Sequence, residues 1–257
     1  MTLIQFGPVL AVGLFVGVLA FLELGRRIGR RRIASGGAET GFGAVESAVF
    51  GLMGLLIAFT FSGAAGRFDA RRDLVTREAN AIGTAWLRID LVPGEAQAKL
   101  RDLFRRYLDS RLATYRNTGE LEIAMAEFAR SATLQLDIWK VAVAACRDPG
   151  AAPGAPMLLL PALNEMIDIT TTRLMATRMH PPGIIFAMLV VLTLAGALLA
   201  GHAMASHPRW SWMHALAMAT VMAATVYIII DLEYPRLGFI RVDGTDEVLV
   251  DLRRSMD

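Results

Sequence analysis

Few side chains in this sequence have the types and the spacing that chemistry requires. An enzyme needs a nucleophile beside a base, or a cluster of metal ligands. The four histidines are His180, His202, His207 and His214. They show no ligand spacing, and three of them lie near the ends of apolar segments. No phosphate-binding glycine loop or nucleotide motif occurs. The sequence therefore predicts a protein that is not an enzyme and that uses no metal and no cofactor.

A second group of polar side chains stands among apolar residues on two predicted helices. Glu78 and Asn80 lie on one helix, and Asn164 and Asp168 lie on the other, ahead of Arg173. Polar groups that satisfy one another inside a protein fix the way in which helices pack. We expect these residues to make structural contacts of this kind.

The composition indicates an integral membrane protein. Of the 257 residues, 54% are hydrophobic and 19% are charged, and the mean hydropathy is +0.46. The charges are segregated from long apolar runs, which favours a membrane protein over a soluble enzyme. The formal net charge of +2 is too small to argue for a nucleic-acid partner. The predicted partner is the lipid bilayer.

Four apolar segments are long enough to cross a bilayer as helices. They cover residues 6–24, 47–66, 183–201 and 213–230. Arginines follow the first segment, whereas a cleaved signal peptide carries its positive charge before the apolar run, so we expect this segment to be retained. Within it, Gly13 and Gly17 have the small-xxx-small spacing that permits another helix to approach closely.

The second apolar segment passes without a proline into an arginine-rich amphipathic stretch. Helical spacing continues to the break at Pro93. We expect one long helix that leaves the membrane and enters a soluble helical domain. Beyond it, apolar residues recur at spacings of three and four, which predicts helices over about 100–115, 120–146 and 158–180.

The predicted fold is an all-α membrane protein with four transmembrane helices and a helical soluble insert between the second and the third. Residues 1–66 form transmembrane helices 1 and 2, and residues 67–180 form the soluble helical domain. Residues 181–231 form transmembrane helices 3 and 4, and residues 232–257 form a polar C-terminal tail. Arginines flank the spans on both faces, so the distribution of positive charge leaves the side of the helical domain open.

Several residues carry a resemblance to known membrane proteins. Phe59, Arg67, Phe68 and Arg72 have the spacing found at the end of the second membrane helix of bestrophins. The order of elements is also similar, with two spans, a helical domain, two more spans and a tail. Three further stretches resemble an uncharacterised bacterial membrane family with a bestrophin-like domain: residues 77–88, 163–168 and 235–242. The chain is identified as a member of that family, with a distant resemblance to bestrophin channels.

Bestrophins are pentameric ion channels, so the resemblance implies a homo-oligomeric channel, expected to be a homo-pentamer, that passes small inorganic ions. It implies that the second helix lines the pore through Gly51, Leu55 and Phe59, although Gly51 replaces the bulky residue that bestrophins carry there. Glu46 and Arg67 are expected at the pore mouth. The acidic run of calcium-sensing bestrophins is missing, so no calcium site is expected. The implied location is the bacterial inner (plasma) membrane.

The same residues allow interpretations without conduction. Leu55 and Phe59 could face lipid or pack on other helices, and Glu46 could reach interfacial water or line a vestibule that attracts cations. Arg67 could lie in a solvated ring, attract anions or hold lipid phosphates. The alternative function is a non-conducting membrane scaffold or partner-binding protein. A scaffold predicts that the face of Leu55 and Phe59 is buried against the first or the fourth membrane helix, whereas a channel predicts that it faces a symmetry axis.

Overall fold

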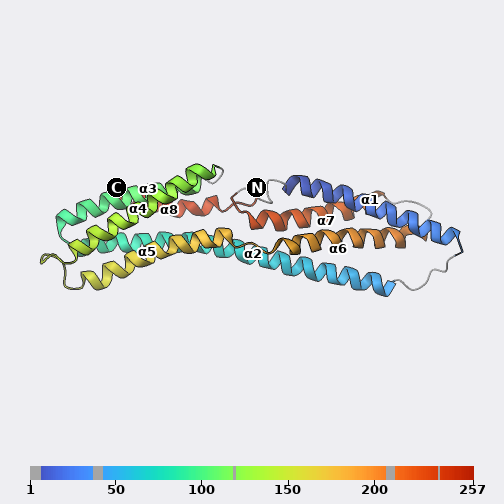
Figure 1. Ribbon diagram of the computed structural model, residues 1–257, viewed down its shortest axis with the longest axis horizontal. Coiled ribbons are helices and arrows are strands. Elements are labelled where there is room, and N and C mark those ends of the chain that lie inside the picture. Colours follow the sequence, from blue (N-terminus) through green and yellow to red (C-terminus); the bar gives the residue numbers. More distant parts are fainter. Residues whose placement is uncertain (1–6, 37–42, 118–119, 207–211, 237) are drawn as a thin grey trace. The chain divides into compact units, whose positions relative to one another are not determined.

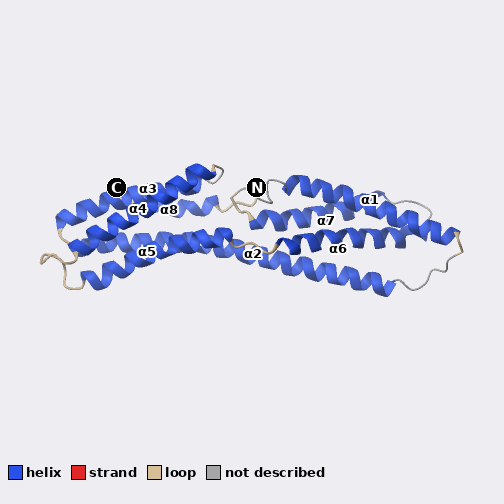
Figure 2. Cartoon of the chain, in the orientation of Figure 1, coloured by secondary structure: helices blue, strands red, loops and turns tan. Residues whose placement is uncertain are grey.

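The computed structural model describes residues 7–36, 43–117, 120–206, 212–236 and 238–257. Across these residues the chain is helical and contains no strand (Figure 2). The helices are α1 (Gly7–Ala34), α2 (Gly43–Leu87), α3 (Gly94–Arg116), α4 (Leu121–Ala145), α5 (Ala155–Arg178), α6 (Gly183–Ala203), α7 (Trp212–Glu233) and α8 (Glu247–Arg254). Short 3-10 turns are η2 (Arg88–Leu91), η3 (Met204–Ser206) and η4 (Asp243–Asp246).

Four runs of helix in the described residues are long and apolar enough to cross a membrane. They are Gly7–Ala34, Gly43–Leu91, Ala155–Ser206 and Trp212–Glu233. Each of them covers the described residues of one of the four apolar segments that the sequence analysis identified. The predicted fold class, an all-α membrane protein with four spans, is confirmed.

The chain divides into two compact units. Unit 1 comprises Met1–Arg67 and His180–Phe239, and unit 2 comprises Phe68–Met179 and Ile240–Asp257. The single helix α2 contributes its apolar part to unit 1 and its charged part to unit 2. The C-terminal tail, which the sequence described only as polar, contains the helix α8 and belongs largely to unit 2.

In unit 1, α1 packs against α6 and α7 (Figure 1). The backbones of α1 and α6 touch where two glycines meet. A Cβ atom on Gly25 would lie 2.0 Å from the carbonyl oxygen of Leu198, and one on Gly201 would lie 2.0 Å from the carbonyl oxygen of Leu22. Gly29 follows Gly25 by one helical turn and lies against Ala205. Small residues therefore set the distance between these helices, as is common in membranes.

The glycine pair that the sequence analysis selected for close approach is the wrong one. A Cβ atom on Gly13 would meet nothing within 4 Å, and one on Gly17 would meet only the flexible side chain of Leu194 at 3.1 Å. The pair with backbone contact, Gly25 and Gly29, has the same spacing about three turns further along α1. The spacing alone does not distinguish the pairs, because it does not show where the partner helix crosses.

Unit 2 is a bundle of α3, α4, α5 and the charged part of α2, closed at one side by α8. Fully buried side chains from each of the four long helices form its core: Ile82, Phe104, Ile138 and Leu163. The tail is held by Leu249, which is buried, and by Arg105, whose Nε donates a hydrogen bond to the carbonyl oxygen of Met256 at 2.8 Å. This core follows the apolar spacing that predicted the helices.

Candidate functional site

The apolar part of α2 has one exposed face. Leu55 is 52% exposed and Phe59 is 69% exposed, although both are large apolar side chains. Gly51, one turn earlier, is also exposed, and a Cβ atom there would meet nothing within 4 Å. The three residues predicted to line a pore therefore share a face of α2 that the described residues of the chain leave open.

The opposite face of α2 is the one that packs inside unit 1. Met53, Thr60 and Ala64 are buried. Phe50 and Met53 lie against Gly196 of α6, where an added Cβ atom would be 3.4 Å from Phe50 Cε1 and 3.5 Å from Met53 Sδ. The helix thus contacts its own chain through this face. The burial of Leu55 and Phe59 that the scaffold alternative predicts is not seen among the described residues.

The two residues predicted at the pore mouth do not share the exposed face. Successive residues of an α-helix are separated by about 100°, so Leu55 and Phe59 differ by about 40° around α2. By the same count, Arg67 lies about 120° from Leu55, and Glu46 lies about 180° from it. Glu46 is half-buried in the first turn of α2, where a carboxylate interacts favourably with the helix dipole.

Arg67 takes part in a cluster with the end of α7. Its Nε donates a hydrogen bond to Glu233 Oε1 at 2.8 Å, and its Nη2 donates to the same oxygen. Glu233 is 1% exposed, and its Oε2 lies 3.5 Å from His180 Nδ1. The ring of His180 stacks on Tyr234 with a centroid distance of 4.5 Å. The sequence analysis considered only solvent, anions and lipid for Arg67, and so missed a buried carboxylate of its own chain.

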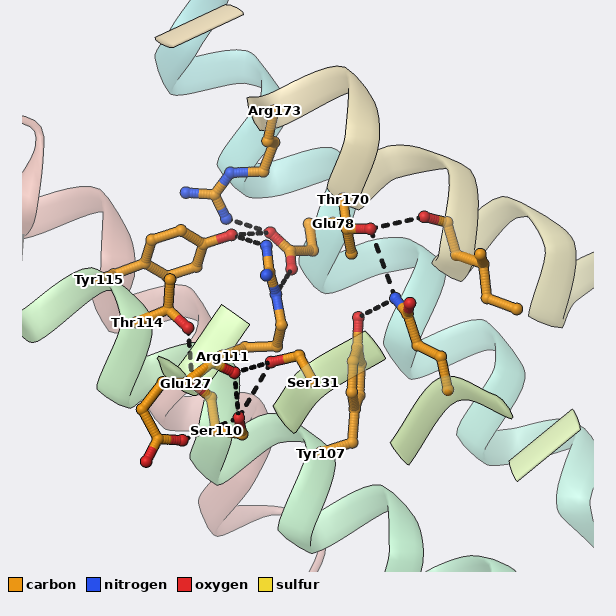
Figure 3. Close-up of polar contacts among 12 residues, drawn as sticks. Glu78, Tyr107, Ser110, Arg111, Thr114, Tyr115, Glu127, Ser131, Thr170 and Arg173 are labelled. Carbon is orange, nitrogen blue, oxygen red and sulfur yellow. Dashed lines mark hydrogen bonds and ion pairs between the residues drawn. The ribbon is translucent and has the colours of Figure 1, made fainter. Parts of the chain in front are cut away.

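A second polar cluster lies in the core of unit 2, around Glu78 (Figure 3). The Glu78 side chain is fully buried. Its Oε1 accepts a hydrogen bond from Arg111 Nε at 2.6 Å, and its Oε2 accepts one from the Tyr115 hydroxyl at 2.8 Å and another from Arg173 Nη1. These residues come from α2, α3 and α5. One carboxylate therefore ties three helices together.

The charges of this cluster determine its protonation. Burial alone would raise the pKa of Glu78, but the guanidinium groups of Arg111 and Arg173 outweigh it and hold the pKa below its usual value. Burial and the Glu78 carboxylate raise the pKa of Tyr115, so its hydroxyl keeps its proton. Asp246 of η4 lies 3.9 Å from Arg173 Nη2 and supplies a second negative charge.

The buried Arg111 also contacts aromatic rings. Its Nη1 has no hydrogen-bond partner among the described residues. The carbon Cζ of the guanidinium lies 4.9 Å from the ring centroid of Tyr115 and 5.6 Å from that of Phe128. Cation–π attraction to these two faces offsets part of the cost of burying the charge. The arrangement suits a structural ion cluster, with the carboxylate engaged by all three of its neighbours.

A comparison with known families identifies the chain. A family model described as a bestrophin-like domain matches residues 12–246, which include parts of every helix except α8. The chain belongs to the bestrophin-like family. No curated protein and no solved structure matches it.

In this bestrophin-like chain, the polar residues selected from the sequence do not form one group. Glu78 makes buried structural contacts, as expected. Asn80, Asn164 and Asp168 are exposed, and their side chains form no hydrogen bond with the described residues. The expectation that these three would contact one another is therefore wrong. They stand on the outward faces of α2 and α5, opposite the faces that enter the core.

The partners of Glu78 on α3 were missed, although the sequence carries a signal for them. Arg111 stands in register with the apolar stripe of α3, next to Leu108 and Leu112, and Tyr115 follows one turn later. A charged residue in such a stripe requires a buried counter-charge. In the described part of the chain, no group of three or more His, Cys, Asp or Glu side chains could hold a metal ion.

Proposed function

We propose that this bestrophin-like protein is a homo-oligomeric ion channel, with five copies arranged around a pore lined by α2. The observation that supports the proposal is the open face of Leu55 and Phe59 on a helix whose opposite face packs inside its own unit. A ring of such side chains in an oligomer narrows the pore and gates it by dewetting. At Gly51, one helical turn before Leu55, the lack of a side chain leaves a wider ring.

The proposed cargo is small inorganic ions, and the proposed location is the bacterial inner membrane. Membership of the bestrophin-like family and four helices able to span a membrane support this assignment. Arg67, about two turns beyond Phe59 on α2, forms an ion pair with Glu233, so these two side chains contribute little net charge at that level.

Bilayer recording with matched phenylalanine variants tests the proposal. The purified protein is inserted into a planar bilayer, and its currents are compared with those of Phe59→Ala and Phe61→Ala. Phe61 is 45% exposed but lies about 160° from Phe59 around α2. We expect Phe59→Ala to raise the single-channel conductance, because it widens the ring of side chains that narrows the pore. We expect Phe61→Ala to leave the conductance unchanged. Ion substitution then measures the selectivity.

Three outcomes would contradict the proposal. If the protein is a monomer in native membranes, there is no ring of copies in which α2 could line a pore. A well-folded oligomer that carries no current, in the wild type and in Phe59→Ala, favours the non-conducting scaffold or partner-binding protein. Equal conductance changes in the two phenylalanine variants would exclude α2 as the pore helix.

A further inference from the structure

The end of α1 carries a surplus of positive charge. Two helical turns contain five arginines: Arg26, Arg27, Arg30, Arg31 and Arg32. Arg26 and Arg27 both pair with Glu23, each at 2.8 Å. Arg30 and Arg31 are exposed and form no ion pair with the described residues. Because residues 23–46 as a whole carry three glutamates against these five arginines, the connection between the first two spans keeps a net positive charge.

Arg30 and Arg31 follow the point where the neighbouring helix of unit 1 ends. α1 runs beside α6 (Figure 1), and a Cβ atom on Gly29 would lie 2.5 Å from Ala205 Cβ, in the short turn η3 that follows α6. Over the roughly 22 residues from Gly7 to Gly29, a rise of about 1.5 Å per residue gives about 33 Å. This length is close to the thickness of the hydrocarbon core of a bilayer, about 30 Å. The two arginines therefore reach the level of the lipid headgroups when unit 1 spans the membrane.

The same end of α1 exposes large apolar side chains. Leu24 and Ile28 are each 46% exposed, and Ile33 is 45% exposed. Arg31 follows Leu24 by seven residues, so their side chains differ in direction by about 20° around α1. Exposed leucine and isoleucine are unfavourable in water, and arginine is unfavourable in the hydrocarbon core. The boundary between the two accommodates both, because an arginine lays its methylene stem along apolar chains and keeps its guanidinium among the headgroups.

The arginines at the opposite end of unit 1 have partners within the chain. Arg67 of α2 donates two hydrogen bonds to Glu233, whose side chain is buried. Arg236, which follows α7, also interacts within the chain. In the described part of unit 1, the arginines left for an external anion are therefore Arg30 and Arg31.

We infer that Arg30 and Arg31 bind the phosphate of an anionic phospholipid in the leaflet at this end of unit 1. A guanidinium donates paired N–H groups that match the oxygens of a phosphate, and basic side chains beside a membrane helix attract anionic lipids. A phospholipid also supplies acyl chains for Leu24 and Ile28, which a soluble anion does not. The site does not depend on conduction, so a channel and a scaffold would both have it.

Fluorescence quenching by brominated lipids in vesicles tests the inference. The full-length protein is first freed of its single cysteine by Cys146→Ser. A fluorescent label is then attached at Ile28→Cys, next to the arginines, or at the matched position Val9→Cys, which is exposed at the other end of α1. Quenching by phosphatidylglycerol and by phosphatidylcholine, each brominated near the headgroup end of its acyl chains, measures which lipid lies beside each label.

We expect phosphatidylglycerol to be preferred over phosphatidylcholine at residue 28 by at least about fivefold, the size expected from one basic side chain at an anionic headgroup. At residue 9 no preference is expected. The double substitution Arg30→Gln with Arg31→Gln is expected to abolish the preference at residue 28, whereas Arg30→Lys with Arg31→Lys, which keeps both charges, is expected to retain most of it.

A second pair of arginines controls for the change in net charge. Arg116 and Arg147 in unit 2 are exposed and form no ion pair with the described residues. Arg116→Gln with Arg147→Gln therefore removes the same charge from the protein and is expected to leave the lipid preference at residue 28 unchanged.

Several outcomes would overturn the inference. Equal quenching by the two lipids at residue 28, or a preference that survives Arg30→Gln with Arg31→Gln, shows that these arginines do not bind the anionic lipid. A label at residue 28 that no brominated lipid quenches places this end of α1 away from the membrane. Loss of the preference in inorganic phosphate, but not in chloride of equal ionic strength, assigns the site to a soluble anion. The comparison of residues 28 and 9 requires no arginine substitution, so it tests the inference even if a variant does not fold.

Discussion

The two units of this protein hold their helices together by different means. In unit 1, α1 and α6 touch through backbone atoms at Gly25 and Gly201, where any side chain would collide. In unit 2, the helices are separated by large buried side chains such as Phe104, and by an ion cluster around Glu78. The same chain thus uses its smallest residues in one unit and its largest in the other.

The difference follows from the solvent that each unit is built for. Between helices in lipid the hydrophobic effect gives no driving force, because lipid tails are as apolar as leucine, so close packing of small residues takes its place. In water, burying large apolar side chains contributes about 25 cal/mol per Å². Unit 2 can therefore tolerate the cost of burying Glu78, Arg111 and Arg173 in its core, whereas the contact between α1 and α6 in unit 1 depends on shape.

The largest effect is expected from the ion cluster of unit 2. Glu78→Ala removes the carboxylate and leaves Arg111 and Arg173 buried without it, which is expected to destabilise unit 2 by about 3–5 kcal/mol. Hydrogen exchange of the full-length protein, followed peptide by peptide, measures the loss of protection in α3 and α5. Protection of α6 is expected to stay unchanged. Asn80→Ala, which lies on α2 as Glu78 does, serves as the control. If Glu78→Ala keeps the protection of α3, the cluster does not stabilise the unit.

A smaller effect, confined to the other unit, is expected from a single methyl group. Gly25→Ala places a Cβ atom 2.0 Å from the Leu198 carbonyl oxygen, so α1 and α6 must separate. Overpacking of this kind costs about 1–3 kcal/mol. Loss of hydrogen-exchange protection in α1 and α6 measures this destabilisation.

Gly13→Ala is the matched control for Gly25→Ala. A Cβ atom there meets nothing within 4 Å, and alanine is the better helix former. We therefore expect unchanged or slightly greater protection of α1. Equal losses in the two variants would show that the backbone contact at Gly25 does not set the packing of unit 1.

Acid is expected to act on unit 2 through Glu78. The pKa of Glu78 is lower in the folded protein than its usual value of 4.5, so the unfolded chain binds this proton more readily. The stabilisation is therefore complete above the unfolded value and is lost as the pH falls through the lower, folded value. Thermal unfolding of unit 2, measured at decreasing pH, should show this loss. In Glu78→Gln the part of the pH dependence that comes from this group should disappear; its persistence would assign the effect to other carboxylates.

The smallest effect is expected on the exposed face of unit 2. Asn164→Ala removes a side chain that forms no hydrogen bond with the described residues, so the stability of the unit should change by no more than about 0.5 kcal/mol. Thermal unfolding of the variant in detergent checks this. A loss near that of Glu78→Ala would mean that the amide makes contacts inside the unit.

Local sequence patterns were sufficient for the elements. A run of about 20 uncharged residues commits a segment to a helix in lipid, because every backbone group must be hydrogen-bonded there. The unbroken spacing from the apolar part of α2 to Pro93 likewise predicted one helix through both units, and the structure shows α2 as a single helix from Gly43 to Leu87. Spacing also placed Gly51, Leu55 and Phe59 on one face.

The choice of partners was decided only in the tertiary structure. Gly13 with Gly17 and Gly25 with Gly29 have the same spacing, and the crossing point of α6 selects the second pair. Arg67 meets Glu233 from a helix far along the chain. Helical periodicity specifies the direction in which a side chain points, but not which helix lies in that direction. That choice depends on the packing of whole helices, in which distant residues compete for the same contacts.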